Sequence, residues 1–197
     1  MSSLRRPEHY SLDEYLALER ASERRFEYRN GEIVCMSGGS AQHAEIAANI
    51  IAYLKTKLRG RSCHVYGSDL AIDAPGGRPY RYPDVSVVCG ERRIEEVDGR
   101  DCLSNPVILV EVLSPASASY DLGVKFEEYK SIPTLTDYIL VAQDRPYVIR
   151  RTRDDRNTWR ETAFESLDAT VHLESVDVNL DMRDVYEGLE FQQTAED

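Results

Sequence analysis

Two acidic residues interrupt apolar segments of the chain and could together bind a metal ion. Glu111 stands inside the apolar segment 106–115, and Asp84 opens the apolar run that follows Pro83. An ionised carboxylate in such a segment is costly unless it is paired or bound to a cation. If the two strands pair, both carboxylates could hold one Mg²⁺, with Mn²⁺ as a substitute, because Mg²⁺ takes one or two carboxylates plus waters or phosphate oxygens. The alternatives are a buried salt bridge or a solvated strand end for Glu111, and a plain strand start for Asp84.

A lysine on the next predicted helix is the third candidate. Lys125 shares the apolar stripe of segment 121–132 with Leu122, Phe126 and Tyr129, because residues three and four apart lie on one helix face. Its ammonium could stabilise charge that develops on a phosphate, or orient an attacking water. The alternative is that the side chain extends along the helix margin into solvent.

Six further residues are auxiliary candidates around Asp84, Glu111 and Lys125, which we call the candidate trio. Glu45 shares a helix face with alanines that would allow close packing near the sheet, although a solvated glutamate fits as well. His43 could line the site or be a hydrogen-bonded core histidine, and Glu32 could reach the centre or be a surface charge. The remaining three candidates could hydrogen-bond to the trio and are Ser114, Asp121 and Tyr129. The alternative for Tyr129 is a position in the core.

The first part of the chain predicts a helix followed by a hairpin. Ser11 and Glu14 have capping-box spacing, which opens a helix over 12–20. An Asn-Gly pair at 30–31 tolerates the positive φ of a type I′ turn, so 25–36 is interpreted as a hairpin. A second helix should follow a Ser40 N-cap and cover 41–58. Its expected inward stripe contains Ala44, Ala47, Ile51, Leu54 and Leu58, widened by Ile50.

The rest of the chain predicts a mixed sheet flanked by helices. Segment 106–115 has the length and β-branched content of a central strand covered on both faces. The expected elements are strands over 63–74, 80–90, 106–115 and 137–144, a charged loop over 91–105, a helix over 121–132, a hairpin over 146–164, and an edge strand with a short helix within 171–188. This order predicts an α/β fold in one domain over 1–197, with a core at about 41–144 and hairpin extensions on both sides.

Composition is that of a globular protein, with 42% hydrophobic and 30% charged residues. No apolar run approaches the ~20 residues of a membrane span, and no apolar stretch follows the N-terminal arginines, so we expect a cytoplasmic protein without a secretory signal. The net charge of −11 argues against broad attraction to DNA, which depends on Lys and Arg. Any contact with nucleic acid should therefore be local, at basic runs such as 59–61 and 92–93, and should need a divalent cation.

Four cysteines are scattered without metal-ligand spacing: Cys35, Cys63, Cys89 and Cys102. We expect reduced thiols rather than a zinc site or disulfides.

The pattern resembles the PD-(D/E)XK nuclease superfamily and, more narrowly, the bacterial restriction-endonuclease-like family of unknown specificity. The likeness rests on Pro83-Asp84, on Glu111 in EVLSPAS and on the helix with DLGVKFEEY, and it extends over nearly the whole chain. It implies an αβββαβ core, Mg²⁺ bound by Asp84 and Glu111, and a lysine that assists phosphodiester hydrolysis. Leu113 occupies the position where the parent motif has its lysine. Similar families place that lysine on the following helix, which implies Lys125.

The leading hypothesis is therefore a Mg²⁺-dependent endonuclease that acts on DNA, and the resemblance to restriction-type enzymes implies a homodimer. One alternative is a catalytically inactive nuclease fold that binds nucleic acid or a protein partner. Another is an antitoxin-like or scaffold protein whose acidic surface mimics DNA. The motifs of serine hydrolases, P-loop triphosphatases and zinc proteases (GxSxG, GxxxxGK[ST] and HExxH) are absent from the sequence.

Overall fold

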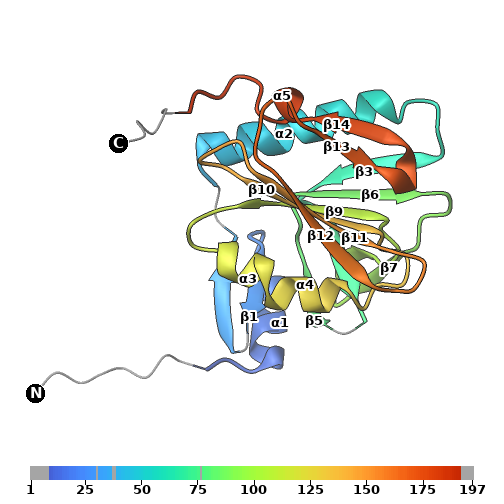
Figure 1. Cartoon of the computed structure of the whole chain (residues 1–197). Helices are drawn as coiled ribbons and strands as arrows, with labels where there is room; N and C mark the ends of the chain where they lie inside the picture. Colours follow the sequence, from blue (N-terminus) through green and yellow to red (C-terminus); the bar gives the residue numbers. More distant parts are fainter. Residues whose placement is uncertain (1–8, 30, 37–38, 76, 192–197) are drawn as a thin grey trace, which may run out of the picture.

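The fold centres on a six-stranded mixed sheet in a computed structural model that describes residues 9–29, 31–36, 39–75 and 77–191 (Figure 1). The strand order is β12-β11-β10-β9-β6-β3. Only β9 and β10 run parallel, and the other neighbours are antiparallel. The strands are β3 (Cys63–Gly67), β6 (Val85–Cys89), β9 (Ile108–Leu113), β10 (Asp137–Ala142), β11 (Val148–Arg153) and β12 (Trp159–Phe164). Segment 106–115 is thus the central strand that its composition predicts.

Helix α2 (Ala41–Lys57) covers one face of this sheet together with the C-terminal segment. That segment contains β13 (Thr170–Leu173), a 3₁₀ turn (Glu174–Val176), β14 (Val178–Asp181) and α5 (Met182–Val185). Strands β13 and β14 pair with each other rather than adding an edge strand to the main sheet, which corrects the expectation for 171–188. The buried stripe of α2 contains Ile50 and Leu54 and extends to Leu58, as expected. It differs at the start of the helix, where Ile46 is buried and Ala44 is exposed.

The opposite face of the sheet packs against α3 (Ala118–Leu122), α4 (Val124–Tyr129) and a four-stranded sheet. The single helix expected over 121–132 is two short helices, because the chain breaks at Gly123 (φ −109°, ψ −94°). The four-stranded sheet has the order β5-β4-β8-β7. Its strands are β4 (Ala71–Ala74), β5 (Gly77–Arg81), β7 (Ile94–Val97) and β8 (Arg100–Leu103).

This second sheet corrects three expectations. The strands expected over 63–74 and 80–90 each split, and their halves enter different sheets. The second split falls at Tyr82–Asp84, where Pro83 lacks a backbone donor for a ladder hydrogen bond. The charged segment 91–105 is a hairpin rather than a loop. Its turn uses Asp98 and Gly99, which both have positive φ.

The N-terminal elements follow the sequence patterns. Helix α1 (Leu12–Ala21) begins with the Ser11–Glu14 capping box, and β1 (Phe26–Arg29) pairs with β2 (Glu32–Cys35). Gly31 has φ +95°, as the predicted turn requires, whereas its predicted partner Asn30 lies outside the described residues. None of the helices in the described ranges is long and apolar enough to cross a membrane.

The cysteine expectation is wrong for one pair. Cys63 and Cys89 face each other across the antiparallel pair β3–β6 and form a disulfide, with Cα atoms 4.0 Å apart. Register between strands distant in sequence brings them together, and cysteine spacing alone does not reveal it. Cys35 and Cys102 are free thiols.

Candidate active site

The two acids of the candidate trio lie at the same end of neighbouring strands. Strands β6 and β9 pair with Val85 opposite Val110, so Asp84 and Glu111 follow one step further along. Asp84 also binds β9 directly, because its Oδ2 accepts a 2.6 Å hydrogen bond from the Val112 N–H. The sheet therefore brings together the two carboxylates that the sequence singled out.

Glu111 is almost completely buried and contacts Lys125, the third member of the trio. The Lys125 Nζ lies 2.8 Å from its Oε1, and the Tyr129 hydroxyl donates a 3.0 Å hydrogen bond to the same oxygen. Burial raises the pKa of Glu111 well above its usual value, and the charges of Asp121 and Asp84 add to this increase, while Lys125 opposes it. The contact with Lys125 therefore does not fully offset the cost of burying the ionised carboxylate.

Lys125 points inward and is only 1% exposed, so it does not extend to solvent. Besides Glu111, its Nζ lies 3.1 Å from a carboxylate oxygen of Glu27 and 3.6 Å from one of Asp121. Burial alone would favour the neutral amine, but these three carboxylates outweigh it and raise the pKa of Lys125 well above its usual value. The side chain is held as an ammonium ion at the centre of an acidic cluster.

Glu27 of β1 is the residue that the sequence reasoning missed. It is fully buried, and Arg29, two residues along the same strand face, binds it at 2.9 Å. Although burial opposes ionisation, the charges of Lys125, Arg81 and Arg29 lower the pKa of Glu27 to about 2. The available signal was strand alternation, which places Glu27 and Arg29 on one face of a short hairpin strand.

A partly buried ion pair holds α4 in place. Arg81 at the end of β5 binds both carboxylate oxygens of Glu128 with hydrogen bonds of 2.7 Å. Since Glu128 and Lys125 lie on the same short helix, this bidentate contact fixes the position of the lysine relative to the sheet.

His43 lines the site. It lies in the first turn of α2, where its backbone N–H donates to the N-cap hydroxyl of Ser40. Its Nε2 lies 2.9 Å from the Oδ1 of Asp84, and this hydrogen bond raises the pKa of His43. A Cβ at Gly39 would come within 2.8 Å of the imidazole, so glycine there leaves space for the ring.

The other auxiliary candidates separate into two groups. Tyr129 and Asp121 contact the trio, and both are buried. Glu45 and Glu32 are exposed, and the Glu45 carboxylate lies beside Gly188 rather than against the sheet. The Ser114 hydroxyl lies 2.9 Å from that of Ser117, so it stabilises the turn after β9 instead of reaching the trio. The structure therefore brings Asp121, Tyr129 and His43 to the trio and leaves Glu45, Glu32 and Ser114 outside.

The donor set suits a hard cation that keeps part of its water shell. Within the described ranges, no three His, Cys, Asp or Glu side chains form a ready-made metal cage. Mg²⁺ does not need one, because it usually takes one or two carboxylates and completes its octahedron with water and substrate oxygens. Asp84 and Glu111 are such a pair, and the contacts that Lys125 and Tyr129 make with Glu111 both fall on its Oε1.

Comparisons with known proteins show the family of the chain. The model of the family described as "Uma2: Putative restriction endonuclease" matches residues 12–183. Two Synechocystis sp. proteins, named "Uncharacterized protein slr1290" and "Uncharacterized protein sll1609", are each 32% identical to the chain. The first match covers 92% of this chain and 93% of the relative, and the second covers 66% and 73%.

A solved structure shares the fold. It is described as a "putative nuclease belonging to DUF820" from Anabaena variabilis, and it superposes with a TM-score of 0.70 at 20% sequence identity. The match covers 89% of this chain and 97% of the other. The predicted restriction-endonuclease-like α/β fold is thereby confirmed.

Proposed function

The chain belongs to the Uma2 family, within the PD-(D/E)XK nuclease superfamily, and we propose that it is a divalent-metal-dependent endonuclease that hydrolyses DNA phosphodiester bonds. The observation that carries the proposal is the contact between Lys125 and Glu111 at 2.8 Å, beside Asp84. Lys125 of α4, which contacts Glu111, would take the part of the lysine that the parent motif has at the position of Leu113.

Each residue has a separate role in the proposed reaction. Asp84 and Glu111 would hold Mg²⁺ or Mn²⁺, which when bound supplies an activated water and neutralises the scissile phosphate. Lys125 would stabilise the charge that develops on the phosphate or orient the attacking water. Tyr129 would keep Glu111 in position, because burial raises the pKa of its hydroxyl well above the usual value and keeps it a donor.

The charge balance of the site supports a cation there. Four carboxylates gather at the trio: Glu27, Asp84, Glu111 and Asp121. Lys125, Arg29 and, when protonated, His43 contact them at 3.1 Å or less. A divalent ion between Asp84 and Glu111 would offset the remaining repulsion.

Plasmid nicking tests the proposal directly. Supercoiled plasmid is incubated with Mg²⁺ or Mn²⁺ and wild type, Asp84→Asn, Glu111→Gln or Lys125→Met, and thermal melts establish that each variant is folded. We expect each substitution to lower the nicking rate by about 100-fold or more. Arg156→Ala, on the exposed turn between β11 and β12, is the control and should nick like wild type. Equal rates in all five proteins would refute the catalytic assignment.

A second candidate function is a catalytically inactive nuclease fold that binds nucleic acid or a protein. The net charge of −11 and the complete burial of Lys125 among carboxylates favour it. Calorimetric titration with Mn²⁺ separates the two functions. A working centre should bind the ion and lose this heat in Glu111→Gln, whereas an inactive fold should give no heat in either protein.

We also propose a homodimer, because restriction-type enzymes commonly cut both strands as symmetric pairs. Sedimentation velocity over a range of protein concentrations tests this. A sedimentation coefficient that stays at the monomer value at every concentration would refute it.

A further inference from the structure

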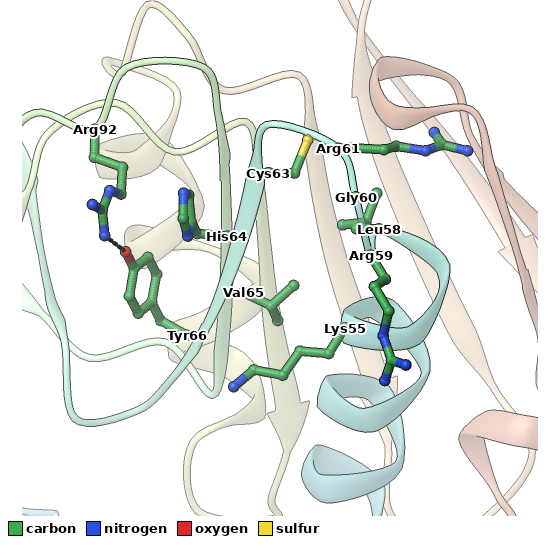
Figure 2. Close-up of a pocket in the computed structure, with 10 residues that line it drawn as sticks. All are labelled: Lys55, Leu58, Arg59, Gly60, Arg61, Cys63, His64, Val65, Tyr66 and Arg92. Carbon is green, nitrogen blue, oxygen red and sulfur yellow. Dashed lines mark hydrogen bonds between the residues drawn. The ribbon is translucent and has the colours of Figure 1, made fainter.

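We propose that a basic pocket at the far end of α2 binds the phosphate backbone of duplex DNA, outside the candidate active site. The pocket has a volume of about 380 Å³ and lies between the end of α2 and β3 (Figure 2). Its cationic lining consists of Lys55, Arg59, Arg61 and Arg92, with His64 beside them. Among the described residues that line it, none is acidic.

This composition differs from that of the whole chain. The protein has 35 acidic against 24 basic residues, so a pocket with four cations and no carboxylate is a local reversal of charge. Nucleic-acid binding depends on such local patches, because each phosphate that is neutralised releases condensed counterions. The fold brings the basic run 59–61 together here with Arg92 of the second run.

The side chains come from separate elements, as a backbone-binding surface requires. Figure 2 shows Lys55 and Arg59 on the helix side, and His64, Tyr66 and Arg92 on the strand side. Arg92 donates a 3.1 Å hydrogen bond to the Tyr66 hydroxyl, which orients a guanidinium that has further donors for a phosphate. Arg61 instead donates a hydrogen bond to the backbone carbonyl of Val176, which is a structural role. Arg59 and Arg92 are both exposed and are the principal phosphate ligands.

A short duplex is long enough to span the distance between the two sites. His43 at the start of α2 binds Asp84, and Leu58 follows the end of the helix at the pocket. At 1.5 Å per residue, this helix separates the two sites by about 22 Å. Duplex DNA covers that length in about seven base pairs at 3.4 Å each. The inference rests on the proposed action on DNA, and it adds a second contact that would hold the substrate.

Salt-dependent binding tests the inference without cleavage. A fluorescent duplex of about 20 base pairs is titrated with the full-length protein in EDTA, and the logarithm of the binding constant is plotted against the logarithm of salt concentration. We expect Arg59→Ala/Arg92→Ala to bind more weakly and to have a slope less steep by about 1.8, at 0.9 per lost phosphate contact. The matched control Arg156→Ala/Arg160→Ala removes two exposed arginines from the β11–β12 hairpin and should keep the wild-type slope.

Each outcome decides the inference. A pocket variant with the wild-type slope, an equal loss in the control, no binding of wild type to the duplex, or a loss seen only with a single-stranded probe would overturn it. Because EDTA excludes cleavage, an inactive metal centre would leave the result unchanged. Failure of the nuclease proposal and failure of this inference are therefore distinguishable.

Discussion

The Nζ of Lys125 lies 3.1 Å from the Oε1 of Glu27, and both side chains are almost completely buried. Glu27 belongs to the first hairpin, whereas Lys125 belongs to a helix that follows the central strand. This contact gives the proposed catalytic ammonium a counter-ion that does not bind metal in our scheme. When Glu111 shares its charge with an ion, Glu27 still holds Lys125 protonated and in position. The N-terminal hairpin is thus part of the active-site support.

Glu27→Gln should lower the nicking rate by about 10- to 100-fold, as expected when a residue that orients a catalytic group is lost. We expect kcat to fall with little change in KM, because Glu27 does not touch the substrate in our scheme. Glu32→Gln, at an exposed position of the neighbouring strand β2, is the matched control and should behave like wild type. Steady-state nicking assays measure both. A change in KM with an unchanged kcat would contradict a positioning role, and recovery of activity in Glu27→Asp would support it.

Acid should remove stability that Glu27 supplies. Its pKa is about 2 in the folded protein, against an ordinary value of 4.5 for glutamate, so the unfolded state binds more protons between these pH values. The contribution is fully present above about pH 4.5 and is lost as the pH falls towards 2, with a total on the order of 3 kcal/mol. Wild type should therefore lose its stability advantage over Glu27→Gln in this range. Urea unfolding at about pH 7, 4 and 3 checks the trend, and an advantage that grows in acid would contradict it.

Tyr129→Phe should weaken the site while the fold remains intact. The hydroxyl donates to Glu111 at 3.0 Å, and its loss leaves Lys125 as the contact on that oxygen. We expect the nicking rate and Mn²⁺ affinity to fall by roughly tenfold. Tyr186→Phe loses a buried hydroxyl on the other face of the sheet, where it donates to the Ala142 carbonyl, and provides the matched control. Similar losses of activity in the two variants would indicate a general stability effect.

The candidate trio could be predicted because each member breaks a local rule. Glu111 and Asp84 are acids in apolar strands, and Lys125 is a cation on an apolar helix stripe, so each one stands out within a single segment. Glu27 breaks no such rule, since one glutamate in a short, mixed hairpin strand is ordinary on a solvated face. Its burial depends on Lys125 and Arg81, which come from distant parts of the chain.

The fold shows the same limit. Apolar content identified the central strand, and capping patterns identified the helices at Ser11 and Ser40. The division of 63–74 and 80–90 between two sheets depends on which strands pair, and this choice is made across the whole chain. The buried stripe of α2 was predicted correctly at its large aliphatic residues Ile50, Leu54 and Leu58, and wrongly at Ala44, because alanines fit an inner or an outer face equally well.

Thiol labelling should separate the four cysteines into two classes. In denaturant without reductant, two of the four should react, because Cys63 and Cys89 form a disulfide while Cys35 and Cys102 are free. In the folded protein Cys35 should react first, since burial raises the pKa of Cys102 to about 12 and keeps its thiolate scarce. Mass spectrometry after alkylation identifies the modified residues. Cys63→Ser/Cys89→Ser should unfold more easily by about 2–4 kcal/mol, because the unfolded chain is no longer cross-linked. Four reactive thiols in the unreduced protein would show that Cys63 and Cys89 are not joined by a disulfide.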